Sequence, residues 1–128
     1  MTLKKVIVAD NAPKAIGPYS AGIRVNNFVF TAGQLGIDPD SGELVPGGIE
    51  MQTRQALANL TNILEAEGLS LDNVVKTTVF LQDINEFGRM NGVYKELFSG
   101  EYPARSAVQV AALPKGAVVE IEAIAIFE

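Results

Sequence analysis

The 128-residue sequence contains no cysteine and no histidine. Without cysteine, the chain can form neither a disulfide nor a thiolate nucleophile nor a zinc–thiolate site. Without histidine, it lacks the commonest general base and metal ligand of proteins. Any chemistry must therefore come from carboxylates, lysine, arginine, tyrosine, hydroxyls, amides or the backbone, and we predict neither a metal site nor a cofactor.

Positive charge is also scarce, since the formal net charge is −5. No basic stripe is available to neutralise phosphates, which argues against nucleic acid and anionic membranes as partners. No apolar run is long enough to span a bilayer, and the first ten residues, MTLKKVIVAD, do not form a signal peptide. We therefore expect a soluble cytoplasmic protein.

The composition is that of a folded chain, with 48% hydrophobic and 20% charged residues and both signs of charge scattered throughout. The length is that of one domain, and no segment is typical of a linker. We predict a single domain over residues 1–128.

The N-terminal half predicts three strands followed by a helix. Residues 3–8 are typical of a strand, and residues 21–25 and 28–35 flank Asn26–Asn27 as a hairpin. Residues 49–67 have the apolar period of a helix, and Gly68 follows as its C-cap.

The C-terminal half predicts strand, helix and two strands. Residues 74–81 (VVKTTVFL) are rich in β-branched side chains. Asp83 and Glu86 form a capping-box pattern that opens a second helix, which ends at Gly100. ARSAVQVAAL and VVEIEAIAIF flank the turn-forming PKGA, so we predict a long closing hairpin.

These elements predict an α+β fold: a single six-stranded, mainly antiparallel sheet with two helices on one face. The last strand is nevertheless apolar on both faces, with Val119, Ile121 and Ala123 on one and Ile124 and Ile126 on the other. A helix-free face this apolar would be a large exposed patch on a monomer. We therefore expect it to pack against other copies of the chain.

Three polar residues lie where a buried surface is expected. Glu120 and Glu122 share one side of the last strand, where carboxylates are costly unless they are paired or used. Arg105 stands between Pro103–Ala104 and an apolar strand, and Asn91 borders the apolar stripe of the second helix. The structural alternatives are ion pairs or a wet edge for the glutamates, an ion pair with Glu101 for Arg105, and a bond to a nearby carbonyl for Asn91.

Four segments together resemble the Rid (YjgF) family: IGPYS at 16–20, TAGQLG at 31–36, VVKTTVFLQD at 74–83 and YPARSAVQVAALPKGAVVEIEAIA at 102–125. The resemblance extends over essentially the whole chain. It implies a chorismate-mutase-like subunit, a homotrimer, and clefts between neighbouring subunits.

The resemblance also implies an activity, the hydrolysis of 2-imino acids such as 2-iminobutanoate and 2-iminopropanoate, and of their enamine tautomers, to 2-oxo acids and ammonia. Arg105 matches the family's arginine that holds the substrate carboxylate, and Glu120 matches the acid that positions the attacking water. Tyr19, Gly33 and Asn91 match residues that line the cleft, with the Gly33 amide facing the substrate.

The chain departs from the family at two positions. Ala32 stands where a serine is frequent, so a substrate contact could be weakened or retuned. Ala107 stands where some members have cysteine, and this loss should matter little if the backbone of Ala107 contacts the ligand.

The predicted hairpin adds a geometric expectation. It would place Glu120 opposite Ala111, six residues from Arg105, or roughly 20 Å along the strand. No small substrate spans that distance, so we expect each site to take Arg105 and Glu120 from different subunits. A regulatory module that binds small carboxylic acids without turnover is the alternative function, and ribonuclease activity is disfavoured by the acidic charge and the absence of histidine.

Overall fold

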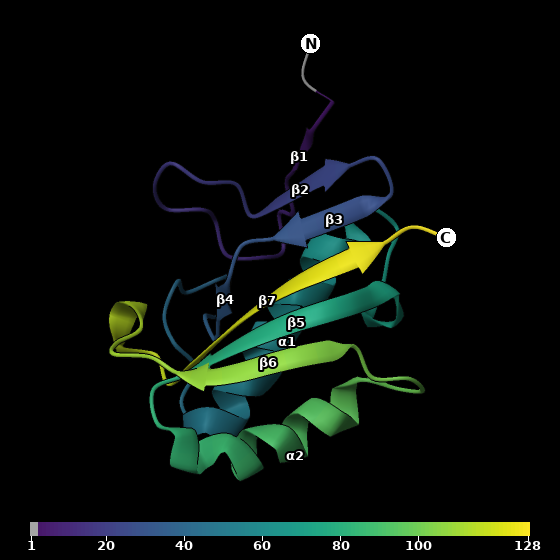
Figure 1. The fold of residues 1–128 in the computed structure, drawn as a ribbon. Coiled ribbons are helices and arrows are strands. Elements are labelled where there is room, and N and C mark those ends of the chain that lie inside the picture. The colour runs from purple at the N-terminus through teal and green to yellow at the C-terminus, as the bar shows by residue number, and fades with distance from the viewer. Residues whose placement is uncertain (1–2) are drawn as a thin grey trace.

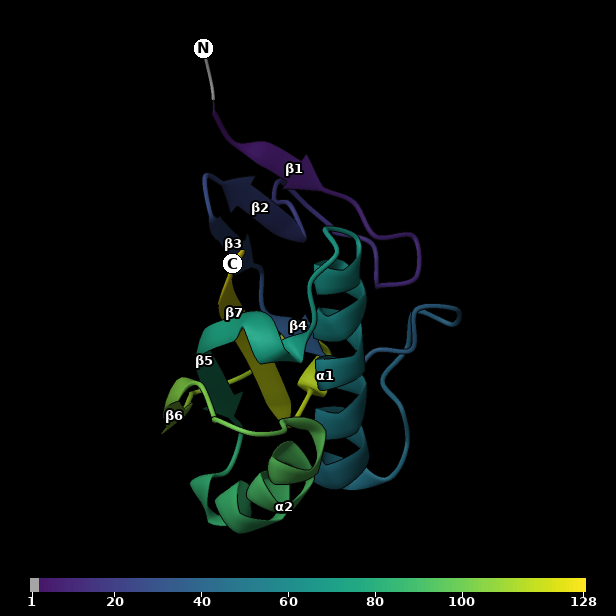
Figure 2. The same ribbon diagram turned by 90° about the vertical axis from the view of Figure 1, so that its right-hand side faces the viewer.

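One mainly antiparallel sheet is covered on a single face by two helices in the computed structural model, which describes residues 3–128 (Figures 1 and 2). The strands are β1 Lys5–Ile7, β2 Gly22–Val25, β3 Phe28–Thr31, β4 Gln34–Leu35, β5 Val74–Leu81, β6 Ala104–Gln109 and β7 Val119–Ile126. The helices are α1 Gly48–Glu65 and α2 Phe87–Leu97. The predicted α+β class, with both helices on one face, is confirmed.

The sheet has seven strands among the described residues, not the predicted six, in the order β1-β2-β3-β7-β5-β6, with β4 also paired to β7. The additional strand arises because the predicted strand 28–35 is interrupted at Ala32 and Gly33. β3 therefore pairs with the end of β7, and β4 pairs with its beginning. The predicted hairpin around Asn26 is confirmed, with Asn26 at φ 51°.

The predicted closing hairpin is wrong. β6 pairs in parallel with β5, and β7 pairs antiparallel with the other side of β5, so β5 separates the two strands (Figure 1). The helix α2 makes the crossover that a parallel pair needs, and the PKGA segment is a 3₁₀ turn inside a longer connection. Glu120 is consequently opposite Phe80 and Leu35, not Ala111. The separation of about 20 Å along a shared hairpin therefore does not apply.

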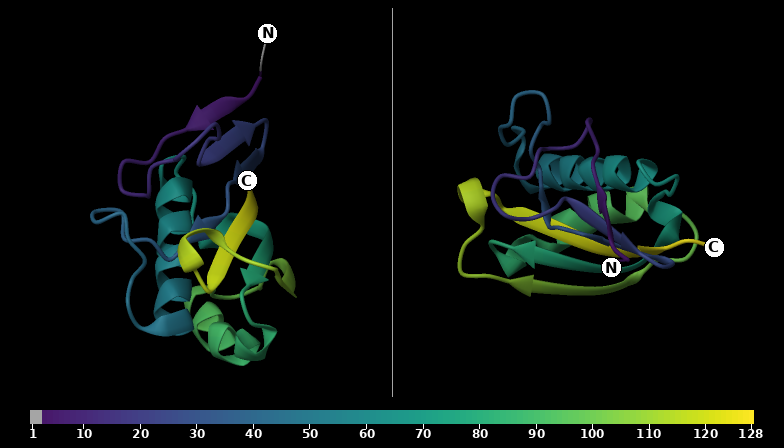
Figure 3. Two further views of the ribbon diagram at one scale, coloured as in Figure 1. Left: turned by 90° about the vertical axis from the view of Figure 1, so that its left-hand side faces the viewer. Right: turned by 90° about the horizontal axis from the view of Figure 1, so that it is seen from above.

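The core lies between α1 and the sheet (Figure 3). The predicted stripe of α1, consisting of Ala56, Leu57, Leu60, Ile63 and Leu64, is fully buried. The helix ends near Gly68, which adopts φ 76°, and the amide of Leu69 donates to the carbonyl of Leu64. Such a left-handed glycine is the usual means of ending a helix.

Helix α2 starts after a short 3₁₀ turn at Ile84–Glu86 that Asp83 caps by accepting from the Asn85 amide at 2.9 Å. The predicted start near Asp83 is therefore close. The helix ends at Leu97, before the predicted end at Gly100, because Phe98 already has extended backbone angles. Within residues 3–128, no helix combines the length and the apolar character needed to cross a membrane.

The face without helices is apolar, as predicted from the two-sided pattern of the strands. Alternate residues of β7 are buried against α1, and those between them are partly exposed. Phe28 and Phe30 are 45% and 41% exposed and stack at 5.9 Å between ring centroids. Val6 on β1 and Val108 on β6 extend this exposed apolar surface across the sheet.

Candidate active site

The side chain of Arg105 packs against one face of α2. Its Nη1 donates to Oδ1 of Asn91 at 2.6 Å, and its guanidinium carbon lies 5.1 Å from the ring centre of Phe87 and 4.7 Å from that of Tyr94. Positions 87, 91 and 94 share one face of the helix because they are four and three residues apart. Aromatic faces attract a guanidinium, and the amide oxygen fixes its rotation.

This guanidinium is half-buried and belongs to none of the ion pairs formed within residues 3–128. The alternative of an ion pair with Glu101 is therefore not observed. Within the same residues, the Asn91 side chain forms no hydrogen bond to a carbonyl, and its oxygen accepts from Arg105. A cavity of about 440 Å³ opens beside Arg105, between α2 and Tyr102–Pro103. A guanidinium with free donors facing a cavity is suited to bind a carboxylate through two parallel hydrogen bonds.

Tyr94 links the α2 residues that contact Arg105 to the sheet. Its hydroxyl lies 2.8 Å from Oγ1 of Thr77, the residue of β5 directly beside Arg105. Burial raises the pKa of the Tyr94 hydroxyl, which therefore stays protonated and can share its proton with Thr77. Both α2 and β5 thus hold the residues that contact Arg105.

Arg105 lies on the face of the sheet that the helices cover, and Glu120 lies on the other face. Glu120 alternates with Val119 and Ile121, which are buried against the helix layer, so its side chain projects from the helix-free face. Burial, and then the negative charge of Glu122, raise the pKa of the Glu120 carboxyl. No hydrogen bond from the described residues satisfies this carboxylate, so it is available to a ligand or to water.

Gly33 lies directly against this carboxylate. A Cβ atom at position 33 would lie 2.7 Å from Cδ of Glu120. Only glycine leaves room for the carboxyl group at this break between β3 and β4. The close approach leaves the Gly33 backbone beside the reactive oxygen atoms of Glu120.

Two amides of α1 hold the segments that carry Gly33 and Glu120. Oε1 of Gln52 accepts from the Val118 amide at 3.0 Å, just before β7 begins. Nδ2 of Asn59 donates to the carbonyls of Leu35 and Ile37 at 3.1 and 2.9 Å. Sequence reasoning missed both residues, although polar side chains inside the apolar stripe of α1 were a visible signal.

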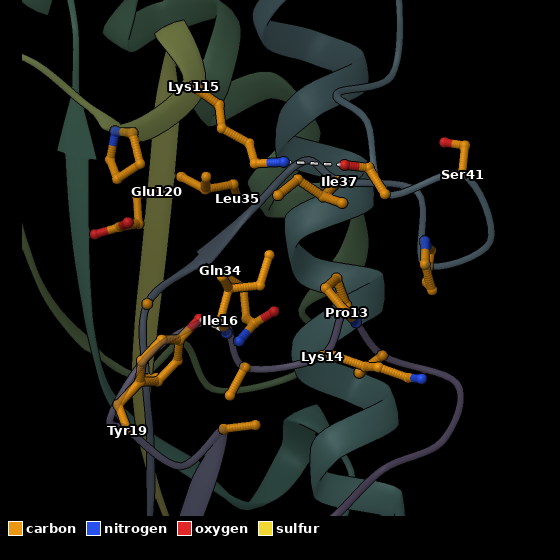
Figure 4. A pocket seen from close by; sticks show the side chains of 18 of the residues that line it. Pro13, Lys14, Ile16, Tyr19, Gln34, Leu35, Ile37, Ser41, Lys115 and Glu120 are labelled. Atoms are coloured by element: carbon orange, nitrogen blue, oxygen red, sulfur yellow. Dashed lines mark hydrogen bonds between the residues drawn. The ribbon is translucent and has the colours of Figure 1, made fainter.

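A cavity of about 820 Å³ lies beside Glu120, between the loop at residues 10–19 and the segment that follows β4 (Figure 4). Tyr19 and Gly33 line it together with Glu120. The Tyr19 ring is half-exposed, and its hydroxyl accepts from the Ile16 amide at 3.3 Å. Within residues 3–128, no group of three or more His, Cys, Asp or Glu side chains is placed to hold a metal ion.

The candidate residues therefore form two groups within one chain. Tyr19, Gly33 and Glu120 line one cavity, whereas Asn91 and Arg105 line the other. Ala107 lies on β6 beyond Arg105 and alternates to the same face of the sheet. β5 lies between the strands that carry Arg105 and Glu120, and the two side chains leave the sheet on opposite faces. A single chain does not bring them together.

Comparisons with known proteins show what this chain is similar to. The sequence model of a family described as endoribonuclease L-PSP matches residues 9–127. A mouse protein named 2-iminobutanoate/2-iminopropanoate deaminase is 55% identical over 97% of this chain and 92% of its own length. The protein of that name from Escherichia coli K12 is 46% identical over 97% and 98%. A crystal structure of E. coli TdcF with bound serine matches with a TM-score of 0.93 at 45% identity, covering 97% of this chain and 99% of that one.

Proposed function

Because this chain belongs to the endoribonuclease L-PSP (YjgF/Rid) family, we propose that it is a deaminase that hydrolyses 2-iminobutanoate, 2-iminopropanoate and their enamine tautomers to 2-oxo acids and ammonia. The observation that carries this proposal is the similarity to relatives named for this reaction, at 46% to 55% identity over nearly the whole chain. The family expected from the four sequence segments is confirmed.

Arg105 binds the substrate carboxylate in this proposal. Two parallel N–H donors of a guanidinium match both oxygens of a carboxylate and fix its position and orientation. The Asn91 oxygen and the rings of Phe87 and Tyr94 already hold the guanidinium before substrate arrives. Orienting the substrate in this way contributes much of the rate enhancement when the substrate is small and has few other groups to bind.

Glu120 supplies the proton transfers. A protonated imine is already electrophilic at its carbon, so modest acid–base help is enough. The carboxylate accepts a proton from water as the oxygen–carbon bond forms and the iminium becomes a neutral carbinolamine, and it then returns that proton to nitrogen. As the carbon–nitrogen bond breaks and ammonia leaves, the carboxylate accepts the remaining hydroxyl proton, so that the carbonyl of the 2-oxo acid forms, and it passes this proton to solvent. Burial raises the pKa of this carboxyl, which makes its ionised form a stronger base toward water.

The remaining candidates complete the site in this proposal. Tyr19 closes one side of the cavity, and the Gly33 amide faces the substrate. Asn91 holds Arg105, and the backbone of Ala107 contacts the ligand on the Arg105 side. No cofactor takes part.

The two groups meet in this proposal only when subunits assemble. Arg105 of one subunit faces the cavity of Glu120 in its neighbour, in a homotrimer whose subunits pack through the helix-free face. The exposed apolar surface around Phe28 and Phe30 supports such packing, because a patch of this kind marks an interaction surface. The position of the two residues on opposite faces of the sheet supports it as well.

The test is an assay in which 2-iminopropanoate or 2-iminobutanoate is generated enzymatically and its decay is followed with and without the protein. We expect faster decay with formation of the 2-oxo acid and ammonia. Unchanged decay, together with tight binding of 2-oxo acids, would instead favour a module that senses carboxylic acids without turnover. RNA cleavage is disfavoured by the net charge of −5 and the lack of histidine.

Two glycine substitutions should separate catalysis from stability. Gly33→Ala should lose most imine hydrolysis with little change in melting temperature, because its Cβ would displace only the flexible end of Glu120. Gly36→Ala is the matched control: its Cβ would lie 2.5 Å from the Gln52 Cα in α1. Such overpacking against backbone should cost about 1–3 kcal/mol of unfolding free energy. Melting curves and initial rates check both, and an active Gly33→Ala enzyme would contradict the placement of Glu120.

Glu122→Gln should move the acid side of the pH–rate profile. The Glu122 charge raises the pKa of Glu120, so its removal should lower that pKa. Because the base must be ionised, activity should then persist to lower pH, and the maximal rate should stay near that of the wild type. The profile of kcat/KM against pH provides the measurement. A shift to higher pH would show that another group controls this limb.

A further inference from the structure

Among the residues that the structure describes, two cations and no carboxylate line the cavity of about 440 Å³ beside Arg105. The lining residues are Asn91, Tyr94, Lys95, Tyr102, Pro103 and Arg105. The chain as a whole has 15 acidic and 10 basic residues, so a cavity without an acid departs from its composition. The larger cavity, by contrast, is lined by acids and bases together, including Asp10, Asp40 and Lys14. A cleft lined by one sign of charge attracts ligands of the opposite sign.

The side-chain groups that remain free in this cavity are mostly hydrogen-bond donors. Lys95 and Arg105 carry donors only. The Asn91 oxygen already accepts from Arg105 at 2.6 Å, so what remains is its Nδ2 group, which donates to nothing within residues 3–128. The Tyr94 hydroxyl is already hydrogen-bonded to β5. The Tyr102 hydroxyl can donate or accept. Such a set of groups favours a ligand that supplies several acceptor oxygens.

Lys95 lies one helical turn beyond Asn91, on the same face of α2. In the described part of the chain, Lys95 belongs to no ion pair and donates no side-chain hydrogen bond. The two acids that follow it in the sequence do not neutralise it. Glu96 is paired with Arg54 at 2.8 Å, and Glu101 is in none of the ion pairs among these residues. The charge of Lys95 is therefore available to a ligand in the cavity.

We infer that Lys95 binds a second carboxylate, so that the site accepts 2-imino and 2-oxo dicarboxylic acids. This inference rests on the proposed function, because it takes Arg105 to bind the carboxylate next to the imine carbon. Two neighbouring cations repel each other until anions neutralise them. A dicarboxylate neutralises both, whereas a monocarboxylate leaves Lys95 unpaired. One helical turn of about 5.4 Å separates Asn91, which holds Arg105, from Lys95, and this suits the span of a five-carbon diacid.

A pair of stable 2-oxo acids tests the inference without turnover. The side chain of 2-oxoglutarate ends in a carboxylate, and that of 5-methyl-2-oxohexanoate has nearly the same shape but ends in two methyl groups. Calorimetry at low salt gives the ratio of their dissociation constants. We expect the preference for the diacid to fall about three- to fivefold in Lys95→Met, which is the upper part of the range for an exposed ion pair. Lys95→Arg should keep the preference, because it keeps the charge.

The controls separate this inference from a general effect of charge and from the proposed function. Lys4→Met removes the same charge from an exposed residue that lines neither cavity, and it should keep the wild-type ratio. An unchanged ratio in Lys95→Met, or an equal fall in Lys4→Met, would overturn the role of Lys95. If the ratio depends on Lys95 but no imine is hydrolysed, the dicarboxylate site stands and the deaminase proposal fails. If imines are hydrolysed but the ratio ignores Lys95, only this inference fails.

Discussion

Replacing Glu120 by glutamine is expected to lower kcat for imine hydrolysis by about 10²- to 10⁴-fold, the usual contribution of a general acid–base group. Glutamine has the shape of the carboxyl group but cannot accept a proton from water. The assay of enzymatically generated 2-iminopropanoate gives the rate. Full activity in this variant would remove Glu120 from the mechanism.

The fold should tolerate this change. The folded-state pKa of Glu120 is raised above its unfolded value, so the folded protein holds this proton more strongly than the unfolded chain does. The contribution of the carboxyl to the free energy of unfolding therefore falls as pH rises from its unfolded-state pKa to its folded-state pKa. At neutral pH, Glu120→Gln should melt at or above the wild-type temperature and keep the same oligomeric state. A large loss of stability would make the activity loss uninformative, and Glu120→Ala would then be compared at a permissive temperature.

Mixing two inactive variants is expected to restore activity. In the proposed mechanism, Arg105→Ala removes the group that binds the carboxylate, and Glu120→Gln removes the base. In an equal mixture, half of the chains keep an intact Arg105 and the other half keep an intact Glu120. Each site is proposed to take Arg105 from one subunit and Glu120 from its neighbour. About a quarter of the sites would then be complete, so we expect about a quarter of the wild-type rate. The variants are denatured together, refolded and checked by mass for mixed assemblies.

A matched mixture provides the control. Gly33→Ala and Glu120→Gln both damage the group that lines the larger cavity, and that group comes from one subunit. No combination of these two chains contains an intact group, so their mixture should stay inactive. Rescue in this control, or no rescue in verified mixtures of Arg105→Ala and Glu120→Gln, would contradict a site shared between subunits.

The elements of this fold could be predicted from the sequence where a local pattern determines them. The period of apolar residues in α1 and the β-branched run of β5 both reflect burial against a neighbouring layer, whichever layer that is. The two-sided pattern of β7 likewise identified the exposed apolar face. Each of these depends on spacing along the chain alone.

Strand pairing could not be predicted in the same way. Two strands flanking a turn have the same local pattern whether they pair with each other or with a third strand between them. The structure shows β5 inserted between β6 and β7, because α2 carries the chain across to a parallel position. This error moved Glu120 relative to Arg105, yet the two remain separated for a different reason, the opposite faces of the sheet.

The candidate site was predicted largely through the family resemblance. Nothing in the sequence pattern around Arg105 indicates that Asn91 would accept its hydrogen bond, because that contact depends on how α2 is rotated about its axis. The supporting amides Gln52 and Asn59 were not predicted, since their partners are backbone groups distant in the sequence. Their places inside the apolar stripe of α1 indicate that they are buried, but not which backbone groups they bind.

The division of the candidate residues between two faces has an evolutionary consequence. In the proposed site, the residues that anchor the acid end of a ligand and the residues that surround the rest of it lie on separate surfaces of the chain. Substitutions around Tyr19 can therefore retune which metabolite is accepted without disturbing the anchor at Arg105. Gene duplication would allow this divergence to go further, because two copies that differ in a single surface could combine into a mixed assembly with more than one selectivity.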